Sequence, residues 1–223
     1  ASAIGMNKTL AKEIVKKLGV KVPYHQFITR EEYSTANAAD LFRSILLPVV
    51  IKLPDGGSSL GASFAKTPKE LWEGIAGALR YGDTVMLEQH IRGKEATVGV
   101  VDEFRGSGHY SLLPIEIVRA DYDSIWGYEE RYDGKTQELC PGRFNEEEKR
   151  GLERLAVLAH KAIGARHYSR SDFIVSLRGI YFLEINTLPG LTRESLVPKA
   201  LGAVGVAMSE FLNHIIQLAL VRK

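Results

Sequence analysis

The clearest structural signal in the sequence is the run Arg170-Ser-Asp172-Phe-Ile-Val-Ser-Leu-Arg-Gly179-Ile-Tyr-Phe-Leu-Glu184-Ile-Asn186. Two segments rich in β-branched and aromatic residues flank the three residues 177–179, which end in glycine. A glycine that can adopt a left-handed conformation is typical of a three-residue hairpin loop. We therefore predict a β-hairpin in which Ser176 and Ile180 close the loop.

This predicted register places two acidic side chains directly opposite each other. Asp172 faces Glu184, and the neighbouring pair on the same side is Arg170 with Asn186. Cross-strand partners have Cβ atoms about 5 Å apart, and two carboxylates with an amide oxygen form a hard oxygen donor set suited to Mg²⁺. Arg170 beside them is suited to hold a phosphate or an oxyanion. The alternative is a solvated polar face on which Arg170 only neutralises the acids.

A second segment, Lys52-Leu-Pro-Asp-Gly-Gly-Ser58-Ser59-Leu-Gly61, follows a predicted strand over residues 48–53. Bare glycine N–H groups and serine hydroxyls can bind phosphate oxygens, although the segment matches neither the Walker pattern nor the dinucleotide fingerprint. Residues 62–66 resemble another strand, so the loop is expected to cover a ligand as a flap. An ordinary turn is the alternative.

A third segment, Glu88-Gln-His-Ile-Arg-Gly-Lys-Glu95, joins two apolar strands expected over residues 84–88 and 95–101. The carboxylates of Glu88 and Glu95 are suited to accept hydrogen bonds from a ribose or an adenine, and surface charge is the alternative. His90 is expected to be structural, because no second histidine stands at metal-ligand spacing.

The remaining pattern alternates helices and strands irregularly, which favours an α+β fold over a doubly wound sheet. Asn7 and Asn145 are placed to cap helices, and the run Thr67-Pro-Lys-Glu70 combines a capping box with proline at the first helical position. Residues 120–143 show no helical or strand period, which indicates a functional or disordered loop. Further helices are expected over 36–46 and between 194 and 220 with a break near Gly205, and a further strand over 112–118.

The composition excludes several classes of protein. The 223 residues carry 29 basic and 27 acidic side chains without a charged run, which argues against a nucleic-acid or membrane-surface partner. Cys140 is the only cysteine, so no internal disulfide can form, and a reducing cytoplasm is expected. Cys140 lies in a polar loop without a neighbouring histidine and is not expected to be a nucleophile. No apolar run approaches the roughly 20 residues of a membrane span.

Together these segments resemble the D-alanine–D-alanine ligase family, and the resemblance runs along nearly the whole chain. The opening Ser2-Ala-Ile-Gly-Met-Asn-Lys8 is similar to a junction in that family, and Lys52–Gly61 to its phosphate-covering loop. The C-terminal signature is matched in spacing by Arg170-x-Asp172, Glu184-x-Asn186-Thr-x-Pro-Gly190 and Ser195-Leu-Val-Pro-Lys199. The resemblance implies an ATP-grasp fold, with two α+β subdomains over residues 1–93 and 94–223 that clamp nucleotide, and a mobile lid over 120–143.

The resemblance also implies a role for each matched residue. ATP phosphates would be bound by Lys8 and Lys52 and covered by Ser58 and Ser59. Adenine would contact Glu88, the ribose Glu95, and two Mg²⁺ ions (or Mn²⁺) would be held by Asp172, Glu184 and Asn186. The oxyanion would be stabilised by Arg170 and the Gly190 backbone, the second amino acid would be bound by Ser195 and Leu196, and the lid would contribute Arg131 and Tyr132, the latter reaching toward Ser58.

The implied reaction joins two D-alanines through an acyl phosphate, for peptidoglycan precursor synthesis, and a homodimer is the expected state of the full-length enzyme. Two departures from the family pattern qualify this expectation. Arg131 stands where the family usually has lysine. The planar guanidinium group of arginine does not bind phosphate in the same geometry as the compact ammonium group of lysine. The chain also starts where the N-terminal domain of the family would end. The alternatives are therefore a different ATP-grasp amino-acid ligase, or a nucleotide-binding module that is inactive by itself.

Overall fold

The computed structural model describes residues 1–35, 43–55, 61–119 and 136–221. Three predicted features lie wholly or partly outside the described residues. These are most of the helix expected over 36–46, the Gly-Gly-Ser-Ser part of the phosphate-covering loop, and residues 120–135 of the expected lid.

The described residues form two compact units. The first contains Ala1–Val22, Gly93–Val118 and Gln137–Lys223, and the second contains the described residues of Pro23–Arg92 with Arg119 and Thr136. One boundary falls at Gly93, as expected for the two subdomains. Residues 1–22, which were expected to belong with the segment up to residue 93, instead pack in the first unit, because helix α2 (Lys8–Lys17) lies against strand β10 (Gly179–Asn186).

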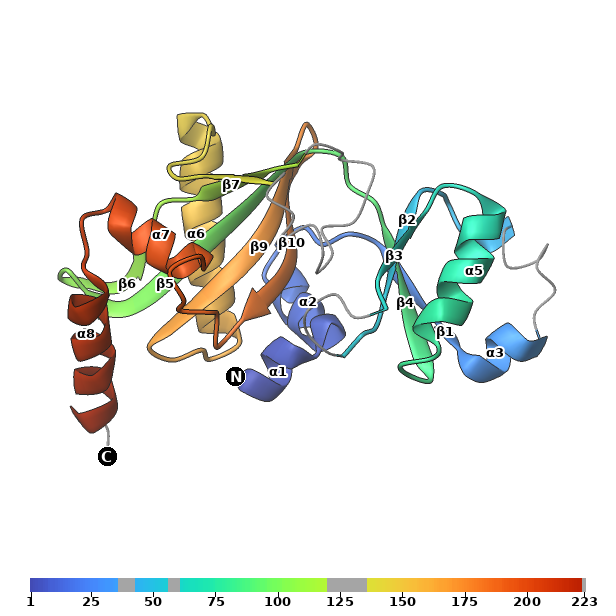
Figure 1. Cartoon of the computed structure of the whole chain (residues 1–223), viewed down its shortest axis with the longest axis horizontal. Coiled ribbons are helices and arrows are strands. Elements are labelled where there is room, and N and C mark those ends of the chain that lie inside the picture. The colour runs from blue at the N-terminus through green and yellow to red at the C-terminus, as the bar shows by residue number, and fades with distance from the viewer. Residues whose placement is uncertain (36–42, 56–60, 120–135, 222–223) are drawn as a thin grey trace. The chain divides into compact units, whose positions relative to one another are not determined.

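The first unit is built on a six-stranded antiparallel sheet (Figure 1). Its order is β10-β9-β5-β7-β8, with β6 paired to the far part of β5. Every strand pair in it is antiparallel, which confirms the α+β class. The strands are β5 (Lys94–Phe104), β6 (Ser107–Ser111), β7 (Ile115–Val118), β8 (Gln137–Leu139), β9 (Tyr168–Ser176) and β10 (Gly179–Asn186).

Two helices cover one face of this sheet. Helix α2 (Lys8–Lys17) packs on β10, and α6 (Glu146–Ala162) packs across β5, β9 and β10. Between helices and sheet lies an apolar core whose members include Val15, Leu152 and Phe173. Because side chains alternate across a strand, the opposite face of the same strands carries the polar residues predicted to form the site.

The predicted helix starts are confirmed. The Asn7 side chain accepts a hydrogen bond from the Leu10 main-chain N–H at 2.8 Å. Asn145 forms a complete capping box with Glu148 at the start of α6, and Thr67 does the same with Glu70 at the start of α5 (Pro68–Ala78). A capping side chain satisfies main-chain donors that the helix itself leaves unpaired.

The β9–β10 hairpin has the predicted register at the polar end but not at the loop. Asp172 pairs with Glu184, as predicted, yet Ser176 pairs with Gly179 and not with Ile180. The loop is therefore one residue shorter than predicted. The register shifts between Phe182 and Glu184, so the extra residue sits there as a β-bulge, and the bulge restores the predicted pairing beyond it.

The second unit contains a four-stranded antiparallel sheet with the order β1-β4-β2-β3. Helix α5 packs on β2 and β3 and buries Leu71 and Ile75 against Ile51 and Leu87. The predicted strand, loop and strand over residues 48–66 are observed as β2 (Val49–Lys52) and β3 (Ser63–Ala65), with part of the loop outside the described residues. The other elements are β1 (His25–Thr29), α3 (Arg30–Thr35) and β4 (Thr84–Gln89).

Two expectations for residues 107–143 were wrong. The strand expected over 112–118 begins only at Ile115, and residues 107–111 form the unpredicted β6. Residues 137–139 were expected to lack regular structure but form β8, which pairs with β7. A three-residue strand is too short to show periodicity, and pairing with the edge of the sheet supplies its order.

Helices α1 (Ser2–Met6), α7 (Leu196–Ala203) and α8 (Met208–Val221) complete the first unit. The predicted break between the last two helices is confirmed, with Gly205 at φ +71°. Among the described residues, no single helix is long and apolar enough to cross a membrane. Helices α7 and α8 together have the length and apolar composition of a membrane span, but the two helices are bent by 107° at the break between them.

Glu116 on β7 should make the stability of the fold pH-dependent. Hydrogen bonds from the Arg143 side chain and main chain lower the pKa of the buried Glu116 carboxyl, against the effect of burial. The contribution is therefore present above the reference pKa of 4.5 and is lost as the pH falls through the lower folded-state value. In urea unfolding between pH 3 and 7, the free energy of unfolding should fall less steeply toward acid pH in Glu116→Gln than in the parent. The difference between the two proteins should correspond to the difference between the folded-state and unfolded-state pKa of Glu116. Glu210→Gln, on the exposed side of α8, should follow the parent, and an unchanged acid limb in Glu116→Gln would contradict the assignment.

Candidate functional site

The polar face of the first unit is centred on Asp172. The Arg170 guanidinium donates to both oxygens of this carboxylate, from Nε and Nη2, at 2.9 Å each. The Thr97 hydroxyl donates to Oδ1 from the neighbouring strand β5. Both side chains of the ion pair are mostly buried, at 13% and 12% exposure. A bidentate arginine–carboxylate pair holds both groups in a defined plane.

Glu184 lies beside Asp172 on β10 and faces the start of α2. The Lys8 ammonium lies 3.8 Å from Glu184 Oε2. Each of the two facing carboxylates thus has a cation next to it, which offsets the repulsion expected from their register. The structure brings Lys8, Arg170, Asp172 and Glu184 together on one face.

Asn186 completes the predicted donor set. It pairs with Arg170 across the β9–β10 ladder, and its Nδ2 atom is buried without a hydrogen-bond partner among the described residues. The oxygen and nitrogen of an asparagine amide are assigned from their surroundings. A buried position without an acceptor suits the amide oxygen, which can bind a cation, better than it suits the NH₂ group.

These observations test whether the site fits the magnesium that the resemblance implies. Two carboxylates and an amide oxygen converge on one face, and one of the amide atoms lacks a partner. Carboxylate and carbonyl oxygens are the ligands that Mg²⁺ prefers. The residues present therefore fit a magnesium ion.

Three carboxylates act on the Arg170 guanidinium. Burial alone would lower the pKa of the Arg170 guanidinium, but the charges of Asp172, Glu184 and Glu138 raise it above its ordinary value. Glu138 on β8 also binds the Lys199 ammonium of α7 at 2.5 Å. These carboxylates therefore hold Arg170 in its charged form.

Glu95 shares this face with the metal-binding candidates. It lies on β5 two positions before Thr97, opposite Ile174 on β9 and Ile117 on β7. Alternate residues of a strand point to the same side, so Glu95 and Thr97 lie on the polar face.

The two predicted ligand-binding residues of the second unit contact each other. Lys52 Nζ lies 2.5 Å from Glu88 Oε1, and the Glu88 side chain is 3% exposed. The alternative of ordinary surface charge is therefore wrong for Glu88. His90 packs edge-on against Phe64 at 4.8 Å between ring centroids, in keeping with the expected structural role.

The segment after β10 brings Gly190 and Ser195 together. A Cβ atom at Gly190 would lie 2.7 Å from Ser195 Oγ, so a larger residue there would require the serine hydroxyl to turn away. Thr192 Oγ1 lies 2.9 Å from the same hydroxyl. Ser195 is the N-cap of α7, and Leu196 is its first residue and is buried.

Four predicted site residues lie outside the described part of the chain. They are Ser58 and Ser59 of the phosphate-covering loop, and Arg131 and Tyr132 of the expected lid. Cys140 is half-buried, and burial raises the pKa of its thiol, which disfavours the reactive thiolate.

Sequence reasoning missed two residues that belong to the polar face. Thr97 binds Asp172, and Glu138 acts on Arg170 and pairs with Lys199. Thr97 lies opposite Asp172 in the pairing of β5 with β9, which joins distant segments that no local pattern marks. Nothing local marks Glu138, because its strand has only three residues.

Comparison with known proteins gives the family. The family model described as "D-ala D-ala ligase C-terminus" matches residues 14–217. The D-alanine–D-alanine ligase of Desulforudis audaxviator is 37% identical over 222 residues, which cover 98% of this chain and 70% of the relative. The ligase of Geobacter sulfurreducens is 35% identical over 219 residues, covering 97% of this chain and 66% of the relative.

Solved structures agree with these relatives. The D-alanine–D-alanine ligase of Bacillus anthracis complexed with ATP has a TM-score of 0.79 at 27% identity, covering 97% of this chain and 66% of that one. The VanG D-Ala:D-Ser ligase of Enterococcus faecalis has a TM-score of 0.82 at 27% identity, covering 97% and 62%. This chain spans about two thirds of the length of its relatives. It belongs to the D-alanine–D-alanine ligase family, of which it represents the part that the family model describes as the C-terminus.

Proposed function

We propose that this chain is the ATP-binding and catalytic part of a cytoplasmic D-alanine–D-alanine ligase. In the proposed reaction, the carboxylate of one D-alanine attacks the γ-phosphate of ATP and forms an acyl phosphate. The amine of a second D-alanine then attacks the acyl carbon, and phosphate leaves. The observation that carries the proposal is the acidic face of Asp172, Glu184 and Asn186 with Arg170 beside it, in a chain of this family.

The proposed magnesium ligands are Asp172, Glu184 and Asn186. Bound Mg²⁺ would neutralise charge on the transferring phosphoryl group. Lys8, which lies 3.8 Å from Glu184, would then be released to bind a phosphate oxygen. Arg170 keeps its bidentate contact with Asp172 and so maintains the orientation of that carboxylate.

Lys52 and Glu88 are proposed to bind ATP as well. Their ion pair supports this, because a phosphate can replace the carboxylate as the partner of Lys52 and leave Glu88 to accept hydrogen bonds from adenine. Glu95, on the polar face of the first unit, is proposed to bind the ribose hydroxyls, and Ser58 and Ser59 to cover the phosphates.

The second amino acid is proposed to bind at the start of α7. Ser195 and the Leu196 main chain would hold its carboxylate, since the first turn of a helix offers unpaired N–H groups. Ser195 Oγ lies close to the position that a Cβ atom of Gly190 would take, which supports a role for the Gly190 main chain next to this carboxylate. Together with Arg170, that N–H would stabilise the oxyanion of the tetrahedral intermediate.

Mass spectrometry of the product of the complete gene tests the proposal directly. With ATP, Mg²⁺ and D-alanine, we expect D-alanyl-D-alanine to form in equal amount with ADP, and no dipeptide with L-alanine. Chain 1–223 assayed in parallel shows whether these residues suffice. ADP release without any dipeptide would overturn the proposal.

The likeness to a D-Ala:D-Ser ligase makes D-serine the competitor to include. Equimolar D-alanine and D-serine offered together should give mainly D-alanyl-D-alanine. A predominance of D-alanyl-D-serine would instead assign the chain to the second type of ligase.

A further inference from the structure

Histidines gather around Asp102, on the opposite side of the sheet from the proposed catalytic face. The chain has six histidines, and four of them contact this residue. His109 and His160 bind its carboxylate through their rings, the His167 main-chain N–H donates to Oδ2 at 2.7 Å, and His214 Nε2 donates to its carbonyl at 2.7 Å. The proposed ligase reaction uses none of these residues.

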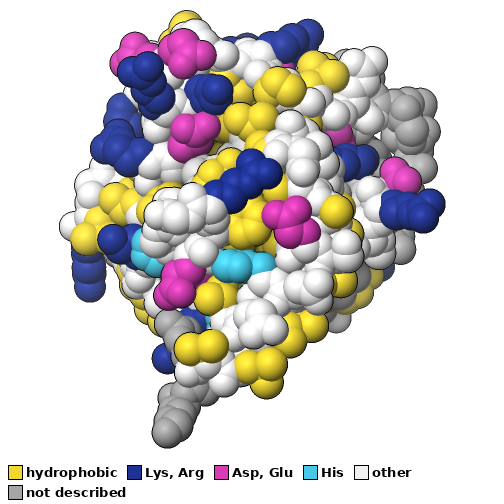
Figure 2. Space-filling view, turned by 90° about the vertical axis from the view of Figure 1, so that its left-hand side faces the viewer, with side chains coloured by type: hydrophobic (Ala, Val, Ile, Leu, Met, Phe, Trp, Pro, Cys, Tyr) yellow, Lys and Arg dark blue, Asp and Glu magenta, His cyan; other side chains and the backbone are white. Residues whose placement is uncertain are grey.

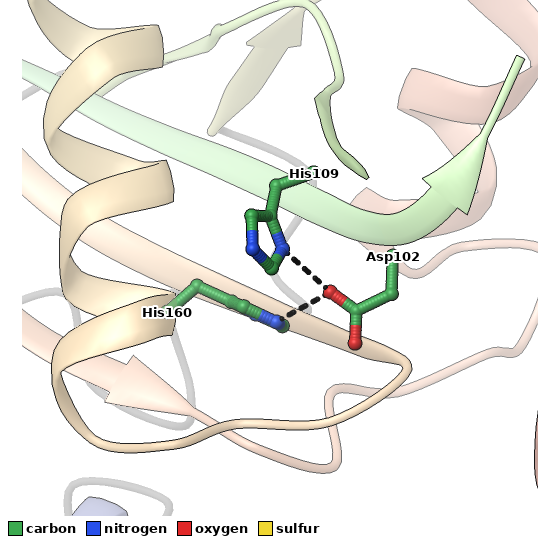
Figure 3. A group of neighbouring side chains, drawn as sticks. All are labelled: Asp102, His109 and His160. Carbon is green, nitrogen blue, oxygen red and sulfur yellow. Dashed lines mark hydrogen bonds and ion pairs between the residues drawn. The ribbon is translucent and has the colours of Figure 1, made fainter. Parts of the chain in front are cut away.

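Three side chains of this group point at one another from three elements (Figure 3). Asp102 lies on β5, His109 on the paired strand β6, and His160 near the end of α6. His109 Nδ1 and His160 Nε2 each lie 2.9 Å from Asp102 Oδ1. One ligand atom from each of the three residues lies within 4.8 Å of the other two.

We propose that Asp102, His109 and His160 form a binding site for a divalent transition metal ion, with Zn²⁺ as the preferred cation and water as the fourth ligand. Two imidazoles and one carboxylate are a donor set that suits Zn²⁺.

The distances between the three ligand atoms need only small changes to match a tetrahedral zinc site. Zinc bonds of roughly 2.0–2.1 Å place tetrahedral ligand atoms roughly 3.3 Å apart, so each contact of 2.9 Å must lengthen by about 0.4 Å. The two imidazole nitrogens must approach each other from at most 4.8 Å. His109 is free to make this movement, because its side chain is 34% exposed.

The surroundings of His160 are already those of a metal ligand. Its other ring nitrogen, Nδ1, lies 2.7 Å from Ser169 Oγ, and metal-bound histidines commonly have such a partner on the second nitrogen. Without metal, Ser169 donates to Nδ1 and Nε2–H donates to Asp102. With metal on Nε2, the proton moves to Nδ1 and Ser169 accepts, so no proton is lost from the ring.

Charge and access also favour binding. Burial lowers the pKa of the His160 imidazole, which keeps it neutral, and hydrogen bonds from His109 and His167 lower the pKa of Asp102 despite its burial. The His109 side chain is 34% exposed, and histidine atoms are visible at the surface on the side that carries β6 and α8 (Figure 2).

The test is a titration of the metal-free full chain with Zn²⁺ by calorimetry and with Co²⁺ by visible absorption. Excess Mg²⁺ in the buffer occupies the oxygen site at Asp172. We expect one Zn²⁺ per chain, and a Co²⁺ spectrum with the intense visible bands of a four-coordinate site. In His109→Asn, the affinity for Zn²⁺ should fall by at least roughly 10–100-fold. That is the usual effect of removing a residue that only supports a metal ligand, and loss of a ligand itself should cost no less.

Three controls make the result specific. His25→Asn removes a histidine of the second unit and should bind as the parent does. Cys140→Ser should keep the Co²⁺ spectrum, whereas loss of a near-ultraviolet thiolate band would assign the ion to Cys140. Zn²⁺ should raise the melting temperature of the parent but not of His109→Asn, in keeping with ligand linkage.

His109→Asn is the primary variant because its side chain is partly exposed, and near-ultraviolet circular dichroism will show whether it is folded. His160→Gln, at a fully buried position, is a second variant. Absence of Zn²⁺ binding to the parent, or equal affinity in a folded His109→Asn, would overturn the proposal and leave the cluster as a hydrogen-bonded network around a buried carboxylate.

Discussion

Glu184→Gln is expected to reduce ATP turnover by the complete gene product more than roughly a hundredfold, since ligand loss should exceed the 10–100-fold cost of losing an outer-sphere partner. The amide keeps the shape of the side chain but removes one of two charges proposed to hold magnesium. Folding should be nearly unaffected. The variant loses one ion pair of 3.8 Å with Lys8 and also loses repulsion from Asp172, and such partly exposed pairs contribute about 0–1 kcal/mol.

Calorimetry with an ATP analogue, with and without Mg²⁺, measures the effect. The parent should bind far more tightly with Mg²⁺ than without it, and Glu184→Gln should lose most of that difference. Glu210→Gln on α8 is the matched control for the loss of one carboxylate charge. The metal assignment is wrong if the variant binds Mg–ATP as tightly as the parent.

Arg170→Met is expected to destabilise the chain by about 3–5 kcal/mol, the usual cost of removing one partner of a buried ion pair. Asp172 is 12% exposed, so its carboxylate would remain buried with Thr97 as its main donor. Arg170→Lys should cost less, because it keeps the charge, but it loses the two-point contact with the carboxylate. Urea unfolding at pH 7 measures both changes.

A double substitution separates charge from packing. Arg170→Met combined with Asp172→Asn removes both charges, and it should recover part of the stability lost in Arg170→Met alone. No recovery would mean that packing of the arginine side chain, and not its pairing with Asp172, accounts for the loss. Dipeptide formation should be impaired in all three variants, because each one alters a proposed catalytic or metal-binding residue.

The part of the fold that sequence predicts best is determined by local rules. A helix cap depends on residues three positions apart, so Asn7, Thr67 and Asn145 could each be identified from sequence alone. The pairing of Asp172 with Glu184 was equally accessible, because both strands of the hairpin are adjacent in the chain. That Asp172, Glu184 and Asn186 lie on one face was therefore predictable before any long-range contact was known.

The features that were missed depend on distant segments. Strand β8 forms only because β7 offers an edge, and Thr97 and Glu138 reach the Asp172–Arg170 pair through strands separated by many residues. Residues 1–22 join the first unit because α2 packs on β10, which lies far along the sequence. The histidine cluster escaped notice for the same reason, since no two of its members stand at ligand spacing.

The bulge between Phe182 and Glu184 offsets the short loop at the tip of the hairpin. A register slip of one residue would normally turn every later side chain of a strand to the wrong face, yet here the ladder already resets itself before it reaches Glu184. Leu177 at the tip is fully exposed, and exposed loop tips are where insertions are best accepted. A peptide tag or a natural insertion between Leu177 and Arg178 can therefore be accommodated without turning Glu184 away from Asp172.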